Sequence, residues 1–375
     1  MSLSGVSASA PSVPVPSAST PALPVFPPPA TGAPEDRPSL PEGSTPPRPA
    51  PFFRQLPVSA FAVVMGLCGL ALVWAKVAQL GWLPGVAGPL AFSFGVFSGM
   101  VFVLLLVLYL RKWIWQPSLV KQEWAHPVGS AFFAGIPVCF ALLAAVALGV
   151  FGPIALPLWA ASAVLQVLVI LFILNAWIHR DALKPAHVNP VWFIPAVATN
   201  MLVPLAGVRL GFIEVSWWFF AVGLLFWGIL LTMVLARMFF VQPPLPDRLV
   251  PAICIFLAPP ALGFLSWTLL TGQYPDGPGL DPLSHLFFGL SIFFFLFLAT
   301  QLHWFARLKF YLSWWAFSFP VAAFTVACLV YQSFVSVWLL KVFAAFMVGL
   351  ASLLVGWLFL RTLLAIWRRE PEFVE

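Results

Sequence analysis

Charged side chains are scarce in this sequence. Only 8% of the 375 residues are Asp, Glu, Lys or Arg, whereas 62% are hydrophobic, and the mean hydropathy is +1.00. A soluble domain typically contains about 25% charged residues. The composition therefore excludes an ordinary water-soluble protein and indicates a membrane protein.

The ionisable and sulfur-containing residues form no catalytic or metal-binding pattern. The chain has four cysteines, none of them in a CxxC pair, which we interpret as buried thiols: Cys68, Cys139, Cys254 and Cys328. We find no Ser-His-Asp set, phosphate-binding loop or metal-ligand spacing. We therefore expect neither an enzyme nor a bound metal or other cofactor.

The alternating ten-residue strands of a membrane β-barrel are also absent, and long apolar stretches are present instead. Each stretch is long enough to cross a hydrocarbon core of about 30 Å as an α-helix. We expect ten spans: residues 57–80, 86–110, 126–150, 153–178, 188–208, 214–240, 249–272, 282–302, 312–332 and 335–366. The predicted fold class is an all-α polytopic membrane protein, with its ten transmembrane helices in a domain at residues 56–368.

Residues 1–55 differ in composition from the rest of the chain. They are rich in Pro, Ser and Ala, and the first 50 residues hold 14 of the 38 prolines. Such a segment cannot bury enough apolar surface to fold alone. We expect a disordered cytoplasmic tail at residues 1–55 and a short cytoplasmic C-terminal tail at residues 369–375. The start of the chain lacks the basic and apolar regions of a signal peptide, so we expect the first span to be retained.

Basic residues gather on one side of the predicted topology. Ten spans place both termini on the same side, and 15 of the 18 Lys and Arg residues fall there. The exceptions are Lys76, Arg209 and Lys341. By the positive-inside rule we predict a multi-pass protein of the cell (inner) membrane with both termini in the cytoplasm. The net charge of +6 then reflects topology in the lipid bilayer and requires no nucleic-acid partner.

Prolines are concentrated in the odd-numbered spans. Bent backbone at membrane depth needs neighbouring protein or a water-filled cavity to satisfy its freed carbonyl groups. The pattern favours five helical hairpins, in which the odd-numbered spans form an inner set and the even-numbered spans face lipid. The simpler alternative is that proline is common in transmembrane helices generally.

The ninth span contains the sequence WWAFSFPVAAFTV, residues 314–326. Helical spacing places four residues on one face: Trp315, Phe319, Ala323 and Val326. Phe317 and Phe324 point to roughly the opposite side, where we expect them to pack. Because Pro320 disfavours helical backbone at the residue before it, we expect a bend at Phe319.

No Asp or Glu lies in the middle of a predicted span, and the five histidines fall near span ends. Proton-coupled carriers commonly use buried acids or histidines, and cation channels use rings of acidic side chains. These absences favour a passive anion channel that selects its ion through backbone dipoles, hydroxyl groups and ring edges. They count against a proton-coupled carrier without excluding it.

Five stretches, one for each odd-numbered span, resemble a known family. They are PVSAFAVVMGLCGLALVW from Pro57, EWAHPVGSAFFAGIP from Glu123, NPVWFIPAVATN from Asn189, ICIFLAPPALGF from Ile253 and WAFSF from Trp315. In their order and spacing, the chain resembles the tellurite-resistance and dicarboxylate transporter family. Its members include the bacterial tellurite-resistance membrane protein, the plant slow-type guard-cell anion channel and fungal malate and sulfite permeases.

The resemblance implies a pseudo-fivefold bundle of helical hairpins whose odd helices line a central pore. It also implies a homotrimer with one pore in each protomer, and a plug formed by Phe319. We predict that seven further residues kink or line the pore: Pro320, Trp315, Ala323, Pro137, Pro195, Pro259 and Gly66. Ser59 and Ala62 stand where relatives have glycine, so we expect a narrower wall there.

The leading functional hypothesis is a passive anion channel for chloride, nitrate or small organic anions, gated by Phe319. The alternative is a secondary carrier that exports C4-dicarboxylate, sulfite or tellurite-type oxyanions. A membrane scaffold or an intramembrane enzyme has no supporting motif.

Overall fold

The computed structural model describes residues 56–179, 183–275, 277–368 and 370. The tails predicted at residues 1–55 and 369–375 lie outside this part of the chain, apart from Glu370. The described residues form helices joined by short connections, with no strand among them.

Ten helical spans are long and apolar enough to cross a membrane within the described residues. They are Val58–Gln79, Ala87–Trp115, Gly129–Val150, Gly152–His179, Pro190–Gly207, Ile213–Phe240, Asp247–Leu270, Pro282–Thr300, Leu312–Phe334 and Trp338–Arg368. The ten spans predicted from hydropathy are therefore confirmed, with ends that differ by a few residues.

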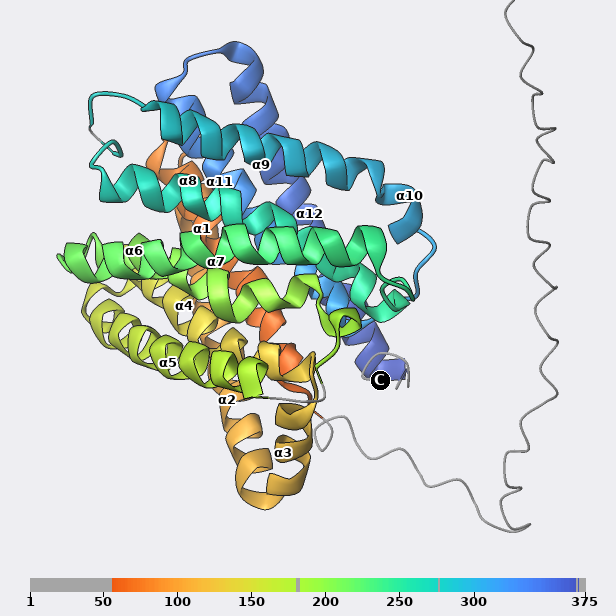
Figure 1. The fold of residues 1–375 in the computed structure, drawn as a ribbon. Coiled ribbons are helices and arrows are strands. Elements are labelled where there is room, and N and C mark those ends of the chain that lie inside the picture. Colours follow the sequence, from red (N-terminus) through yellow and green to blue (C-terminus); the bar gives the residue numbers. More distant parts are fainter. Residues whose placement is uncertain (1–55, 180–182, 276, 369, 371–375) are drawn as a thin grey trace, which may run out of the picture. The chain divides into compact units, whose positions relative to one another are not determined.

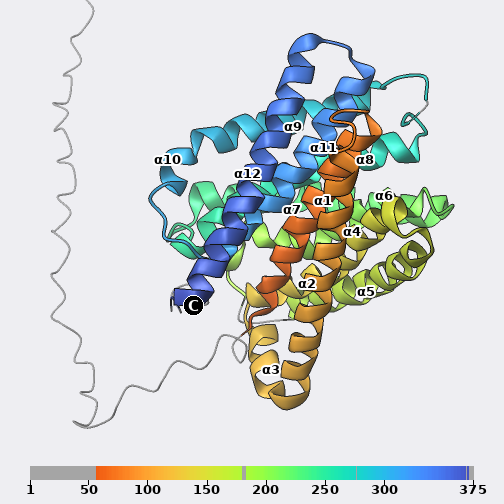
Figure 2. The same ribbon diagram turned by 180° about the vertical axis from the view of Figure 1, so that it is seen from behind.

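The five even-numbered spans are continuous α-helices that lie on the outside of the bundle. They are α2 (Ala87–Trp115), α5 (Gly152–His179), α7 (Ile213–Phe240), α9 (Pro282–Thr300) and α12 (Trp338–Arg368). Figures 1 and 2 show α5, α7 and α9 across one face and α2 and α12 across the opposite face. Only 22% to 33% of the most apolar window of each is buried, so these helices present most of their surface outward.

The five odd-numbered spans are interrupted helices. Each begins with a 3₁₀-helical segment, followed in the fifth span by a π-helical turn, before its α-helix. The pairs are η2 (Val58–Ala60) with α1 (Phe61–Gln79), η3 (Gly129–Ala134) with α4 (Gly135–Val150), η7 (Asp247–Leu257) with α8 (Ala258–Leu270) and η8 (Leu312–Phe317) with α11 (Ser318–Phe334). The fifth span has a 3₁₀ turn, η5 (Pro190–Trp192), and a π-helical turn, η6 (Ile194–Ala198), before α6 (Thr199–Gly207). Between 67% and 94% of their apolar windows are buried, which confirms the inner set.

The inner helices contact one another in a closed circuit. Helix α1 packs against α4, α4 against α6, α6 against α8, α8 against α11, and α11 against α1. Each inner helix also packs against the outer helix that follows it in sequence. The chain therefore folds as five consecutive helix pairs, and the pseudo-fivefold symmetry relating the pairs stays a prediction.

Short helices connect the pairs on the side where the inner spans begin: α3 (Pro117–Ala125), η4 (Pro185–His187) and α10 (Leu302–Phe305). The α2–α3 connection is fixed by Lys112, whose ammonium pairs with Glu123 and donates to the backbone oxygen of Leu56 at 2.9 Å. This contact ties the start of the first inner span to the end of the first outer helix.

Candidate functional site

Two cavities lie inside the circuit of inner helices. The N-side cavity, near the N-terminal ends of the inner spans, has a volume of about 170 Å³. Every one of its lining residues comes from an inner span or from the residue next to one, and Val58, Gly135, Ile194, Ala252 and Ala316 represent the five spans. Because all five inner spans contribute, this cavity lies at the centre of their circuit.

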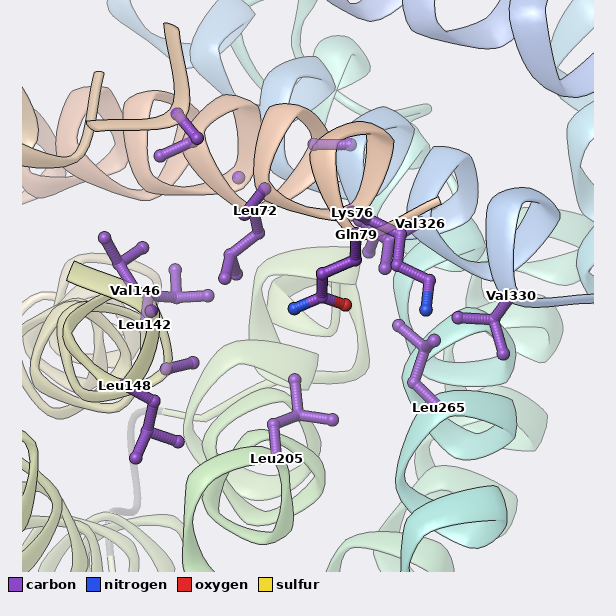
Figure 3. A pocket seen from close by; sticks show the side chains of 18 of the residues that line it. Leu72, Lys76, Gln79, Leu142, Val146, Leu148, Leu205, Leu265, Val326 and Val330 are labelled. Atoms are coloured by element: carbon purple, nitrogen blue, oxygen red, sulfur yellow. The ribbon is translucent and has the colours of Figure 1, made fainter. Parts of the chain in front are cut away.

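The C-side cavity, near the C-terminal ends of the same spans, is larger, at about 530 Å³. It is lined by all five inner spans and by three residues at the start of α2. Figure 3 shows part of its wall, in which leucine and valine side chains surround the polar ends of Lys76 and Gln79. The wall is therefore mainly apolar, and its polar residues are Lys76 and Gln79 of α1 together with Arg209, Thr268 and Tyr274.

Phe319 is the only residue that lines both cavities, among those the structure describes. It is the second residue of α11, and its exposed fraction is 5%. The aromatic ring therefore lies at the boundary between the two spaces.

The other two phenylalanines of this stretch have different surroundings. The ring of Phe317 lies 4.8 Å from that of Phe305, and the ring of Phe324 lies 5.1 Å from that of Phe295, measured between centroids. Neither residue lines either cavity. The packing roles predicted for Phe317 and Phe324 therefore agree with the structure.

The backbone around Pro320 differs from the prediction. Phe319 is helical, in contrast to the non-helical backbone expected before a proline, and the change from 3₁₀ to α-helix occurs earlier, between Phe317 and Ser318. Pro320 is the third residue of α11. A proline in the first turn removes no hydrogen bond from the α-helix, because the N–H groups of that turn have no partner within it.

Trp315, Pro320 and Ala323 all contribute to the cavity walls. Trp315 and Pro320 line the N-side cavity, and Ala323 lines the C-side cavity. The indole Nε1 of Trp315 donates to the hydroxyl oxygen of Thr362 in α12 at 2.9 Å. This hydrogen bond anchors the start of the ninth span to an outer helix.

Gly66 lies in a helix contact and is absent from both cavity walls. A Cβ atom built on Gly66 would lie 2.6 Å from Cβ of Ser318 and 2.9 Å from the ring of Trp315. One turn later, a Cβ atom on Gly69 would lie 2.8 Å from Cβ of Ala322 and 3.6 Å from the ring of Phe319. Gly69, which the sequence analysis missed, is thus the glycine that faces Phe319 and lines the C-side cavity.

Pro137, Pro195 and Pro259 are buried in the inner spans and line neither cavity. The carbonyl oxygen of Pro137 accepts a hydrogen bond from Ser162 at 2.8 Å, and that of Pro195 accepts one from Gln166 Nε2 at 2.7 Å. Both donors belong to outer helix α5. The outer helix thus satisfies inner carbonyl groups, as interrupted helices in a membrane require.

Basic side chains line the cavities, whereas no described Asp or Glu does. Arg248 lines the N-side cavity, and Lys76 and Arg209 line the C-side cavity. Lys76 is a charged residue within an inner span, a signal in the sequence that could have marked it as a cavity residue. No group of three His, Cys, Asp or Glu side chains among the described residues is placed to hold a metal ion.

The relatives include plant S-type anion channels and a bacterial tellurite resistance protein homolog. The S-type anion channel SLAH3 of Arabidopsis thaliana is 27% identical over 321 residues, which cover 84% of this chain and 49% of the relative. The guard cell S-type anion channel SLAC1 of the same plant is 25% identical, over 84% of this chain and 56% of its own length. A tellurite resistance protein TehA homolog of Haemophilus influenzae is 23% identical, over 72% of this chain and 70% of its own length.

The chain thus spans about half the length of the plant relatives that it matches. The sequence profile of the SLAC1 family, described as voltage-dependent anion channels, matches residues 55–363. This range includes all five inner spans and both cavity walls. With its ten apolar spans, this multi-pass membrane protein belongs to the SLAC1 family of voltage-dependent anion channels.

Proposed function

We propose that this protein is a passive anion channel in which the N-side and C-side cavities are two halves of one pore and Phe319 closes it. The observation that carries the proposal is the position of Phe319, which alone among the described residues borders both cavities. The five inner spans supply most of the pore walls, so the proposed path runs along the centre of the bundle.

The charge of the cavity walls supports an anion as the permeant ion. Lys76, Arg209 and Arg248 contribute positive charge, and no described acidic side chain lines either space. A cation pathway would use acidic rings, whereas basic groups raise the local concentration of anions. We propose chloride, nitrate or a small organic anion as the substrate.

Opening requires the Phe319 ring to leave the boundary between the cavities. The C-side cavity provides the space, since Ala322 and Ala323 on α11 have small side chains and Gly69 on α1 has none. A rotation of the ring about its side-chain bonds would carry it toward that space. We propose this rotation as the gating movement.

The test is anion flux through Phe319→Ala in proteoliposomes. If the wild-type channel is open about 10% of the time or less, removal of the ring should raise the chloride flux about tenfold or more. Phe324→Leu is the control, because its ring lies on the same helix but lines neither cavity. A Phe319→Ala protein that keeps its thermal stability and conducts no faster than wild type contradicts the assigned gate.

A secondary carrier is the second candidate. The specific observations that favour it are the 530 Å³ C-side cavity, large enough for an organic anion, and the similarity to a tellurite resistance homolog. Against it, no described Asp, Glu or His lines either cavity to relay a proton. Flux of malate or sulfite that requires an imposed proton gradient would favour the carrier over the channel.

We also propose a homotrimer in the cell membrane, with both termini in the cytoplasm. The excess of Lys and Arg on the side of the termini supports the orientation. Native mass spectrometry in detergent tests the assembly, with a mass of three chains as the expected result. Labelling of single cysteines placed after Arg368 tests the orientation, since they should react only after the membrane is permeabilised.

A further inference from the structure

We propose that Lys76 and Tyr274 form a binding site for one monovalent anion in the C-side cavity. The ammonium group of Lys76 supplies the charge, and the ring of Tyr274 positions it. This site rests on the proposed function for its role in permeation, although its occupancy can be measured without any flux.

The first argument is the burial of an ammonium group that has no hydrogen-bond acceptor and no acidic partner among the described residues. Lys76 is 5% exposed, and its Nζ has no hydrogen-bond partner among the described residues. It lines the C-side cavity, and Figure 3 shows its polar end among the side chains of the cavity wall. A charge inside a membrane protein is costly unless it is paired. Because the described part of the chain supplies no acidic partner, Lys76 keeps its charge only when a counter-ion comes from solution.

The second argument is the position of Tyr274. The Lys76 Nζ lies 3.7 Å from the centre of the Tyr274 ring, within the range of a cation–π interaction. The Tyr274 hydroxyl is 3.4 Å from Oε1 of Gln79, which lies on the same helix as Lys76. The ring covers one side of the ammonium group, whose Nζ is buried, so an anion reaches it through a small movement of the side chains around it. Tyr274 is therefore a positioning residue for the charge.

The surroundings determine the class of ligand. Leu72, Leu142, Leu265 and Val330 contribute to an apolar wall, which stabilises no second negative charge. Arg209 also lines this cavity and its charge acts on Lys76, but its side chain is exposed, so water and salt weaken its effect on an anion. One buried ammonium group therefore matches one negative charge. The geometry points to a monovalent anion such as nitrate or bromide, rather than a divalent oxyanion or dicarboxylate.

The test measures binding in detergent solution, using nitrate as the probe. A ligand that binds the folded state raises the melting temperature with a saturable concentration dependence. Ionic strength is held constant with gluconate. We expect saturable stabilisation of the wild type by nitrate, and for Lys76→Met a midpoint about tenfold or more higher, since a charge-assisted contact is lost. Lys76→Arg should retain saturation, because it keeps the positive charge.

Lys341→Met is the matched control. Lys341 is predicted on the same membrane side and is exposed, but it does not line the cavity, so its removal should leave the nitrate midpoint unchanged. Tyr274→Phe retains the ring and should bind nitrate as wild type does, whereas Tyr274→Leu should bind more weakly. Equal losses in both Tyr274 variants would overturn the positioning role of the ring.

A second measurement keeps the proposal testable if Lys76→Met does not fold. Wild-type crystals soaked in bromide should show an anomalous peak in contact with the Lys76 Nζ. A nitrate midpoint that Lys76→Met leaves unchanged, or a cavity without bromide, overturns the site. The monovalent class is overturned if sulfate or malate competes with nitrate as strongly as chloride does. A failed Phe319→Ala flux test leaves these binding results intact, so the two proposals fail separately.

Discussion

The two sides of α11 place aromatic rings in opposite surroundings, although the rings are almost equally buried. Phe319 is 5% exposed and Phe324 is 0% exposed. Phe324 has three aromatic neighbours, Phe288, Phe295 and Phe343, within 6.3 Å between centroids. Phe319 has no aromatic ring contact among the described residues and lies between two cavities. Burial alone therefore does not separate a packing ring from a ring that blocks a path.

The difference between the two rings is the number of neighbours that each would lose by moving. A packed ring is held by many weak contacts, which together resist rotation. A ring that borders empty space on both sides has fewer such contacts. The cavity-facing side of α11 is thus the side on which a side-chain movement costs least.

The largest expected effect is on stability and comes from Phe324→Ala. Removing a fully packed phenylalanine leaves a cavity and should lower the free energy of unfolding by about 3 kcal/mol. Phe319→Ala should cost less than half of this, because its ring already borders open space. Reversible unfolding in mixed micelles measures both variants. A larger loss for Phe319→Ala would reverse the comparison between the two sides of the helix.

A smaller effect is expected from Gly66→Ala, which tests how the start of α11 is held against α1. The added methyl group meets Ser318 and the ring of Trp315, so the helices must separate at a cost of about 2 kcal/mol. Gly99→Ala, on outer helix α2, is the matched control, since a Cβ there has open space. Equal stability of the two variants would show that the close α1–α11 contact is not needed.

The sequence was sufficient to predict the ten spans and the division into inner and outer sets. Span length and hydropathy depend on local composition, so the predicted span at residues 312–332 lies within Leu312–Phe334 of the structure. The division followed from the prolines, because interrupted backbone needs protein neighbours in a membrane. The burial of the inner spans agrees with that argument.

Other features depended on the register between helices, which a sequence pattern does not contain. Gly66 and Gly69 are one turn apart on α1, and only the packing of α11 decides which of them faces Phe319. Pro320 predicted non-helical backbone at Phe319, but Phe319 is helical and the helix type changes before it, between Phe317 and Ser318. Lys76 could have been noticed as a charge within an inner span, although its proximity to Tyr274 is a tertiary contact.

The smallest effect is expected from Trp315→Phe. Trp315 combines the two surroundings compared above, because it borders a cavity and is also held by a contact with an outer helix. Trp315 lines the N-side cavity, yet its indole N–H is bonded to Thr362. Phenylalanine keeps an aromatic ring and lacks the N–H donor, so the free energy of unfolding should fall by about 1 kcal/mol. Thr362→Val removes the same hydrogen bond from the other side and should cost a similar amount.

The double variant completes this test. If the two side chains act through their shared hydrogen bond, the combined loss is smaller than the sum of the two single losses, because the bond can be removed only once. Strictly additive losses would mean that Trp315 is held by packing of its ring alone. In that case the hydrogen bond does not anchor the cavity-lining part of the ninth span to α12, and Trp315 differs from Phe319 only in the groups that its ring packs against.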